Sequence, residues 1–305
     1  MRRYILSRIL QTIPVLLAVF TLTFLMVRLA PGGPFSSERS VSPKILAQLN
    51  AHYGLDRSLW DQYWTTLGNI ALHGDLGPSF KYEGRSVNEM IASALPVSLE
   101  LGLWAILVAL AIGIPIGVLA AVRRNTWLDY LPMGSAMAGV CLPAFVIGPL
   151  LALVFGLWLG WFNPTGWFGA GDRILPALTL GLPYAAVIAR LTRAGVAEVY
   201  GRDFVRAARA KGVSDARLIG VHVLRGGLIP VVAYLGPAIA GILTGSFVVE
   251  TIFNIPGLGQ LFVNGAFSRD FTLVQGTVLL YAFLVVVLNL LADLGQAWMN
   301  PQSGI

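Results

Sequence analysis

Residues 101–122 read LGLWAILVALAIGIPIGVLAAV, a run of 22 residues without a charge between Glu100 and Arg123. A helix needs about 20 mostly apolar residues to cross the hydrocarbon core of a bilayer, so this run is expected to span a membrane. The whole chain has the same character, because 56% of its 305 residues are hydrophobic and 12% are charged. Soluble domains carry about 25% charged residues. The composition therefore excludes a soluble globular domain and a disordered chain, and it predicts an integral membrane protein.

Uncharged intervals of sufficient length predict six membrane spans. The third interval, 130–171, is long enough for one span or two short ones, but its end is rich in Gly, Pro and Trp and is typical of an interfacial loop. We therefore expect a single span there. The first interval is longer than the apolar part of a signal peptide and has no A-x-A-like site after it, which favours a retained anchor. The predicted spans are 9–27, 101–122, 133–159, 174–189, 226–249 and 271–292.

Basic residues set the expected orientation of these spans. Lys and Arg gather near the N terminus, just after the second span and in residues 190–227, which hold eight of them. The positive-inside rule then predicts that both termini and residues 190–227 are cytoplasmic. We interpret the net charge of +6 mainly as the basic residues that orient the spans in the membrane. These residues are expected to contact anionic lipid headgroups, and binding to nucleic acid is not expected. The domains expected are the first helix (1–30), an extracytoplasmic insertion (31–98), a five-helix core (99–293) and a cytoplasmic tail (294–305).

Two segments are expected to lie outside the lipid. In the insertion, Ser42 and Ser58 are predicted helix caps, and Ser86 with Glu89 has capping-box spacing. The insertion is either a lid or a docking surface for a partner. In residues 190–227, Asp203 is predicted to cap a short helix that stops at Gly212, and Ser214 to cap a second one. This helix–Gly–helix unit either rests on the membrane surface or contacts a partner.

Several chemical features are missing from the sequence. None of the uncharged intervals contains a coupling acid or histidine, and Glu100, Glu250 and Asp293 at span ends are interpreted as interfacial anchors. There is no G-x-x-x-x-G-K-[ST] motif, the three histidines lack metal-ligand spacing, and Cys141 is the only cysteine. We therefore expect no enzyme, but a pore-forming subunit driven by another protein. Prolines and glycines such as Gly113, Pro115 and Gly117 are expected to kink the spans.

Four stretches in order carry a family resemblance: residues 28–35 (RLAPGGPF), 54–56 with 74–80 (GLD and GDLGPSF), 203–212 (DFVRAARAKG), and 250–259 (ETIFNIPGLG) continuing to 269–270 (RD) and 275–276 (QG). Along nearly its whole length the chain resembles the B-type membrane subunits of oligopeptide/dipeptide ABC importers, and most of all their oligopeptide branch. It departs from the family pattern at Gly33, at Gly226 and in the tail 300–303.

The resemblance implies an all-α integral membrane protein with the ABC type I importer permease fold, in the bacterial cytoplasmic (inner) membrane. It implies half of a heterodimeric peptide pore, with a C-type sister permease, two cytoplasmic ATP-binding subunits that hold ATP and Mg, and an extracytoplasmic peptide-binding protein. No cofactor or metal is expected on this chain. The implied ATPase-coupling residues are Asp203, Phe204, Arg206, Ala207, Ala208, Arg209 and Gly212, and the implied binding-protein dock is Trp60, Tyr63, Trp64, Phe80 and Tyr82.

The alternatives left open are a permease of the same family for nickel or another small cargo and a stand-alone secondary carrier. The sequence does not set the length or side-chain preference of a peptide cargo. It also leaves murein peptides, general oligopeptides and dipeptides undistinguished.

Overall fold

The computed structural model describes residues 2–30, 32–35 and 42–299, and nearly all of its regular structure is helical. The chain divides into two compact units, residues 1–97 with 256–286 and residues 98–255 with 287–305. The long helices α4 (Val87–Val122) and α13 (Phe271–Met299) each contribute residues to both units. The predicted all-α class is confirmed.

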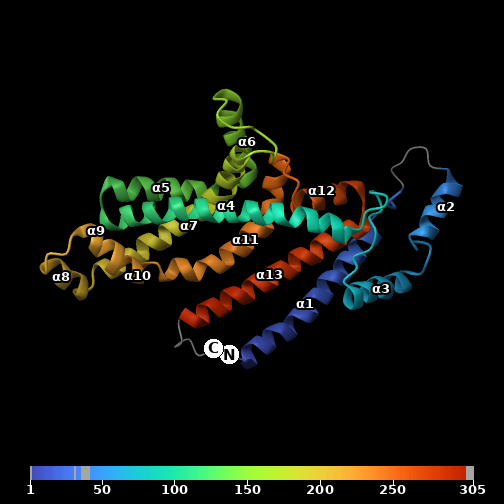
Figure 1. The fold of residues 1–305 in the computed structure, drawn as a ribbon, viewed down its shortest axis with the longest axis horizontal. Coiled ribbons are helices and arrows are strands. Elements are labelled where there is room, and N and C mark those ends of the chain that lie inside the picture. Colours follow the sequence, from blue (N-terminus) through green and yellow to red (C-terminus); the bar gives the residue numbers. More distant parts are fainter. Residues whose placement is uncertain (1, 31, 36–41, 300–305) are drawn as a thin grey trace. The chain divides into compact units, whose positions relative to one another are not determined.

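The first unit holds the residues predicted to form the insertion. Ser58 Oγ accepts a hydrogen bond from the Asp61 N–H at 3.1 Å, and Ser42 caps its helix in the same way. Ser86 and Glu89 exchange backbone-to-side-chain hydrogen bonds at the start of α4, so the capping box is confirmed. The elements of this unit are α1 (Arg2–Leu29), α2 (Pro43–His52), α3 (Leu59–Gly68), η1 (Asn69–His73), α12 (Leu258–Ser268) and the first parts of α4 and α13. Figure 1 labels its α-helices.

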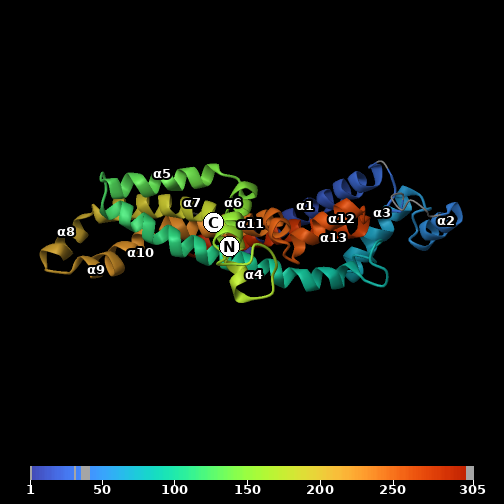
Figure 2. The same cartoon turned by 90° about the horizontal axis from the view of Figure 1, so that it is seen from above.

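The second unit is organised around α7 (Ile174–Tyr200), which contacts both α5 (Trp127–Cys141) and α11 (Ile229–Phe253). The same arrangement is visible from two directions in Figure 1 and Figure 2. The other elements of this unit are α6 (Ala144–Leu151), η2 (Ala152–Trp158), η3 (Ala170–Arg173), α8 (Asp203–Ala210), α9 (Asp215–Arg217), η4 (Leu218–Val223) and α10 (Leu224–Gly227).

Five helices in the described residues are long and apolar enough to cross a membrane: Leu10–Leu29, Val87–Val122, Ala170–Tyr200, Ile229–Phe253 and Phe271–Leu291. The predicted third span, 133–159, is not one helix. Helix α5 ends at Cys141, Pro143 has an extended backbone, and a new helix begins at Ala144. The apolar helical segment that follows, Ala144–Trp158, is short. The count of six spans therefore stays a prediction.

Small residues join α4 to α7. A Cβ atom added to Gly117 would lie 2.5 Å from the Ala189 carbonyl oxygen, and one added to Gly113 would lie 2.7 Å from that of Ala185. The two helices thus touch through their backbones, as small-xxx-small pairs allow. Helix α4 continues through Pro115 and α7 through Pro183, so neither proline ends its helix, and the expectation of kinks stays a prediction.

Glu250 is not an interfacial anchor, because its side chain is fully buried. Its Oε1 accepts hydrogen bonds from the hydroxyls of Ser98 at 2.8 Å and Ser246 at 2.9 Å. Burial of a carboxyl group requires such partners. Glu100 pairs instead with Arg173 at 2.9 Å, and the side chain of Asp293 lies outside the described residues.

Candidate functional site

The segment predicted to couple the chain to an ATPase forms a short bent extension that follows α7. Helix α8 ends at Ala210, and Gly212 reverses the chain with φ +81°, a conformation that favours glycine. The predicted stop at Gly212 is confirmed. The predicted cap is not, because Asp203 is the first residue of α8 and makes no capping hydrogen bond. Ser214 does occupy the position before α9, although its side chain makes no cap.

Helix α8 has one buried side and one exposed side. Val205 is 1% exposed and lies in an apolar cluster with residues of α7 and η4. Phe204, on the outer side, leaves 48% of its surface exposed. Ala208 is half-buried against the same cluster. The exposed members of the predicted coupling set are Asp203, Phe204, Arg206, Ala207, Arg209 and Gly212.

Polar contacts of the extension hold its arginines in place. The Arg209 guanidinium donates to the Tyr200 hydroxyl, lies 5.0 Å from that ring and is 3.5 Å from Asp215. Arg206 lies 3.5 Å from Asp203. The charged side chains of these pairs are exposed, and such pairs contribute about 0–1 kcal/mol each. They orient the positive face of α8 more than they stabilise it.

Two contacts at the base of the extension were not predicted from the sequence. A Cβ atom added to Gly195 of α7 would lie 2.2 Å from the Gly227 carbonyl oxygen of α10, so these backbones touch. Asp129 of α5 is buried and accepts a hydrogen bond from Arg193 Nη2 at 2.7 Å. The Arg193 hydrogen bond, supported by the Asn125 N–H, lowers the pKa of the Asp129 carboxyl. In the sequence, the only sign of the Arg193–Asp129 pair is that each residue lies near the end of its helix.

The predicted dock residues fall into two groups. Phe80 is 6% exposed and packs against Phe35, Tyr53 and Phe271, while Tyr63 is half-buried and its hydroxyl lies 2.9 Å from Thr21 of α1. These two side chains therefore offer a partner little surface. The exposed members of the set are Trp60, Trp64 and Tyr82.

Asp270 joins the insertion to the start of α13. It is fully buried, and its Oδ2 accepts hydrogen bonds from the Ser79 hydroxyl and from the Phe80 N–H at 3.2 Å. Its Oδ1 accepts from the Thr272 hydroxyl at 3.0 Å and from the Leu273 N–H at 3.2 Å. Two of the four motif stretches therefore meet at this carboxylate. Within the described residues, no group of three or more His, Cys, Asp or Glu side chains could hold a metal ion.

Curated relatives align with almost the full chain. The oligopeptide transport system permease protein OppB of Salmonella typhimurium is 46% identical, and that of Haemophilus influenzae is 44% identical, each over 99% of both chains. The dipeptide transport system permease protein DppB of Bacillus subtilis is 39% identical over 99% of this chain and 98% of its own length.

Solved structures share the fold at low identity. A chain of an amino acid ABC transporter has a TM-score of 0.54 at 17% identity and covers 69% of this chain and 94% of its own. A chain of the MetNI methionine ABC transporter, in an inward-facing conformation, has a TM-score of 0.58 at 17% identity, with 68% and 96% covered. The ABC importer permease fold is thereby shown.

Family descriptions match both parts of the chain. Residues 1–102 match the N-terminal region of the binding-protein-dependent transport system membrane component, and residues 113–303 match its main region. The chain belongs to the family of binding-protein-dependent transport system inner membrane components.

Proposed function

We propose that this chain is one of two membrane permease subunits of an ATP-driven importer of oligopeptides. It forms half of the transport pathway in the bacterial inner membrane, beside a C-type sister permease, and both of its termini are cytoplasmic. Relatives named for oligopeptide and for dipeptide transport match it at 39–46% identity over nearly its full length, and this supports a peptide cargo. Two partner ATPases hold ATP and Mg²⁺, and an external binding protein delivers the peptide.

The observation that carries this proposal is that α8 has one exposed face, while its other face packs on a buried apolar cluster. Phe204 and Arg206 point away from the cluster that holds Val205, so a partner can grip α8 without disturbing the cluster. Because Val205 packs against α7, a displacement of α8 moves α7 with it, and the backbone contacts at Gly113 and Gly117 pass that movement to α4. Such a switch requires that the ATPases bind the two states of the permease with different affinity.

The test uses the complete complex with its binding protein, reconstituted in liposomes. Phe204→Ala removes an exposed anchor, and Gly212→Val places a β-branched residue at φ +81°, which distorts the end of α8. We expect both variants to insert normally and to retain ATPase activity, while peptide uptake falls at least tenfold. Phe168→Ala is the control, since this aromatic side chain is 93% exposed in a loop predicted to be external. Normal uptake by both α8 variants would exclude the extension from the mechanism.

The external dock is proposed on the exposed residues of the insertion, Trp60, Trp64 and Tyr82. Cross-linkers placed at these positions should capture the peptide-loaded binding protein, and cross-linkers in residues 190–227 should capture the ATPase. The opposite pattern would reverse the proposed topology.

The cargo and the passive role of the chain are tested separately. Uptake should be inhibited by peptides of graded length and not by Ni²⁺, and inhibition by Ni²⁺ alone would identify a metal importer of the same family. The purified chain without partners should hydrolyse no ATP and accumulate no solute. Uphill transport by the chain alone would support a secondary carrier.

A further inference from the structure

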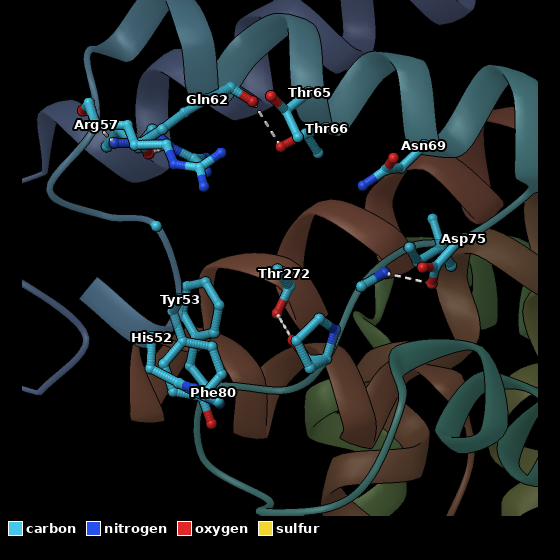
Figure 3. Close-up of a pocket in the computed structure, with 15 residues that line it drawn as sticks. His52, Tyr53, Arg57, Gln62, Thr65, Thr66, Asn69, Asp75, Phe80 and Thr272 are labelled. Atoms are coloured by element: carbon cyan, nitrogen blue, oxygen red, sulfur yellow. Dashed lines mark hydrogen bonds between the residues drawn. The ribbon is translucent and has the colours of Figure 1, made fainter. Parts of the chain in front are cut away.

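A cavity of about 330 Å³ lies among α4, α5, α6 and α7 of the second unit. Among the described residues that line it, Ser135 is the only one with a polar side chain. The cavity of the first unit, shown in Figure 3, differs in this respect, because Arg57, Asn69 and Asp75 bring charged and polar groups to its wall. Ser135 is exposed and Leu142 is 46% exposed, so the apolar cavity opens at the surface of the chain. We call it the α5 groove.

Small residues on two helices leave the space that forms the α5 groove. Pro132, Ser135 and Gly139 lie three or four positions apart and therefore share one face of α5. Helix α7 contributes Ala186 and Ala189 to the opposite wall. A Cβ atom added to Gly139 would meet nothing within 4 Å, so the groove is empty above this residue.

A cluster of charges lies at one end of the α5 groove. One turn beyond the lining residues of α7, Arg193 pairs with Asp129 of α5, and its Nη2 lies 2.7 Å from Asp129 Oδ2. Both Asp129 oxygens accept hydrogen bonds, from Arg193 and from a backbone N–H. After these hydrogen bonds, the charge of Arg124 also lowers the pKa of the Asp129 carboxyl, so Arg124 lies near the same group. In the described residues no carboxylate pairs with Arg123 or Arg124, and this end of the groove therefore has a surplus of positive charge.

This charged end lies at the level where a bilayer has its headgroups. The apolar helix α4 ends at Val122, directly before Arg123. Trp127 is 69% and Tyr130 is 64% exposed, as is typical of aromatic residues at a membrane interface. Helices α4, α5 and α7 run side by side in Figure 1 and Figure 2. From Trp127 to Gly139 the rise along α5 is about 18 Å, close to half of the roughly 30 Å hydrocarbon core. The groove therefore extends from the headgroups through one leaflet.

We propose that the α5 groove binds an anionic phospholipid. Its phosphate lies against Arg124 and against Arg193, whose side chain is 32% exposed, and one acyl chain lies along the small residues of α5. A zwitterionic headgroup fits less well, because the Asp129 oxygens are already occupied and cannot receive its ammonium group. A helix of another subunit also fits less well, because it would bury arginines that have no acidic partner.

Native mass spectrometry of the full chain, purified in a neutral detergent, tests the proposal. The probes are dipalmitoyl phosphatidylglycerol, dipalmitoyl phosphatidylcholine and glycerophosphoglycerol. We expect phosphatidylglycerol to saturate one site and to bind at least fivefold more tightly than phosphatidylcholine. Glycerophosphoglycerol has the same headgroup without acyl chains, and it should not displace the bound lipid.

Two pairs of variants assign the two ends of the lipid. Gly139→Leu fills the groove and should weaken phosphatidylglycerol at least fivefold. Its matched control is Gly134→Leu, because a Cβ atom at Gly134 of the same helix also meets nothing within 4 Å, but Gly134 does not line the groove. Arg124→Gln should remove most of the preference for phosphatidylglycerol over phosphatidylcholine. Arg217→Gln, at an exposed position of α9, should leave that preference unchanged.

The proposal is overturned if the two lipids bind equally, if glycerophosphoglycerol displaces phosphatidylglycerol, or if either control weakens binding as much as its partner variant. Binding to the isolated chain that is absent from the complete complex would place a helix of another subunit in the groove, and it would also overturn the proposal. Peptide uptake does not enter these outcomes, so a failure of the proposed transport function is recognised separately.

Discussion

Replacement of Gly195 by alanine tests the backbone contact beneath the proposed coupling extension. The new Cβ would lie 2.2 Å from the Gly227 carbonyl oxygen and 3.1 Å from its carbon, so α7 and α10 must separate by about 1 Å. Backbone atoms cannot rotate away as a side chain can, and overpacking costs about 1–3 kcal/mol, here near the upper end. A Gly-to-Ala change within a helix returns about 1 kcal/mol. The net expectation is a destabilisation of about 2 kcal/mol.

Gly245→Ala is the matched control for this change. Gly245 also lies inside a long helix, α11, but a Cβ atom added there meets nothing within 4 Å. We expect this variant to be as stable as the unmodified chain or about 1 kcal/mol more stable. Unfolding of the purified chain by a denaturing detergent, followed by tryptophan fluorescence, measures both. If Gly195→Ala proves as stable as Gly245→Ala, the close approach of α7 and α10 is refuted.

Three further predictions concern the buried carboxylates and the foundation of α8. Asp270→Asn should destabilise the insertion by about 3 kcal/mol, because a charged acceptor of several hydrogen bonds is lost, and should speed hydrogen exchange at residues 79–82; unchanged exchange would contradict it. The pKa of Asp129 is lowered in the folded chain, so the charged carboxylate stabilises the fold above the unfolded pKa of about 3.9. This stabilisation is lost progressively as the pH falls below that value. The difference in melting temperature between the unmodified chain and Asp129→Asn should therefore be smaller at pH 3 than at pH 6. Val205→Ala should lower uptake with ATPase activity retained, whereas Val221→Ala, at a 58% exposed position of η4, should not.

Local sequence chemistry predicted the local parts of this fold. The caps at Ser58 and Ser86 and the stop at Gly212 depend on residues within four positions of each other, and all three are confirmed. The apolar runs likewise predicted most of the long helices, because a span needs only its own residues to satisfy its backbone. Pro143 could have predicted that the helix ends there. The prediction instead ended the third span at the tryptophan- and glycine-rich loop further on, so the break at Pro143 was missed.

Contacts between distant residues could not be predicted in this way. Asp270 meets Ser79 across 191 positions, and Arg193 meets Asp129 across 64. Each carboxylate by itself resembles a solvated charge near a helix end, and nothing local shows that it is buried. Gly117 was expected only to kink its helix, and its close contact with Ala189 depends on a neighbouring helix that the local sequence does not reveal. The same limit applies to Phe80, whose aromatic character suited a dock and an internal cluster equally well.

The energetics of the extension indicate which contacts would transmit a force from the proposed partner ATPases. The exposed pairs Arg202–Glu198 and Arg206–Asp203 contribute about 0–1 kcal/mol each, so they would break before α7 moved. Burial of an apolar side chain such as that of Val205 contributes about 1.5–3 kcal/mol to stability. Val205 lies in a cluster with five other buried apolar residues. The cluster, and not the ion pairs, therefore makes α8 and α7 move as one body. Beyond it, α4 and α7 meet at Gly117, where an added Cβ atom would lie 2.5 Å from both the Ala189 carbonyl oxygen and Thr192 Cβ, so close packing there would pass a displacement of α7 on to α4.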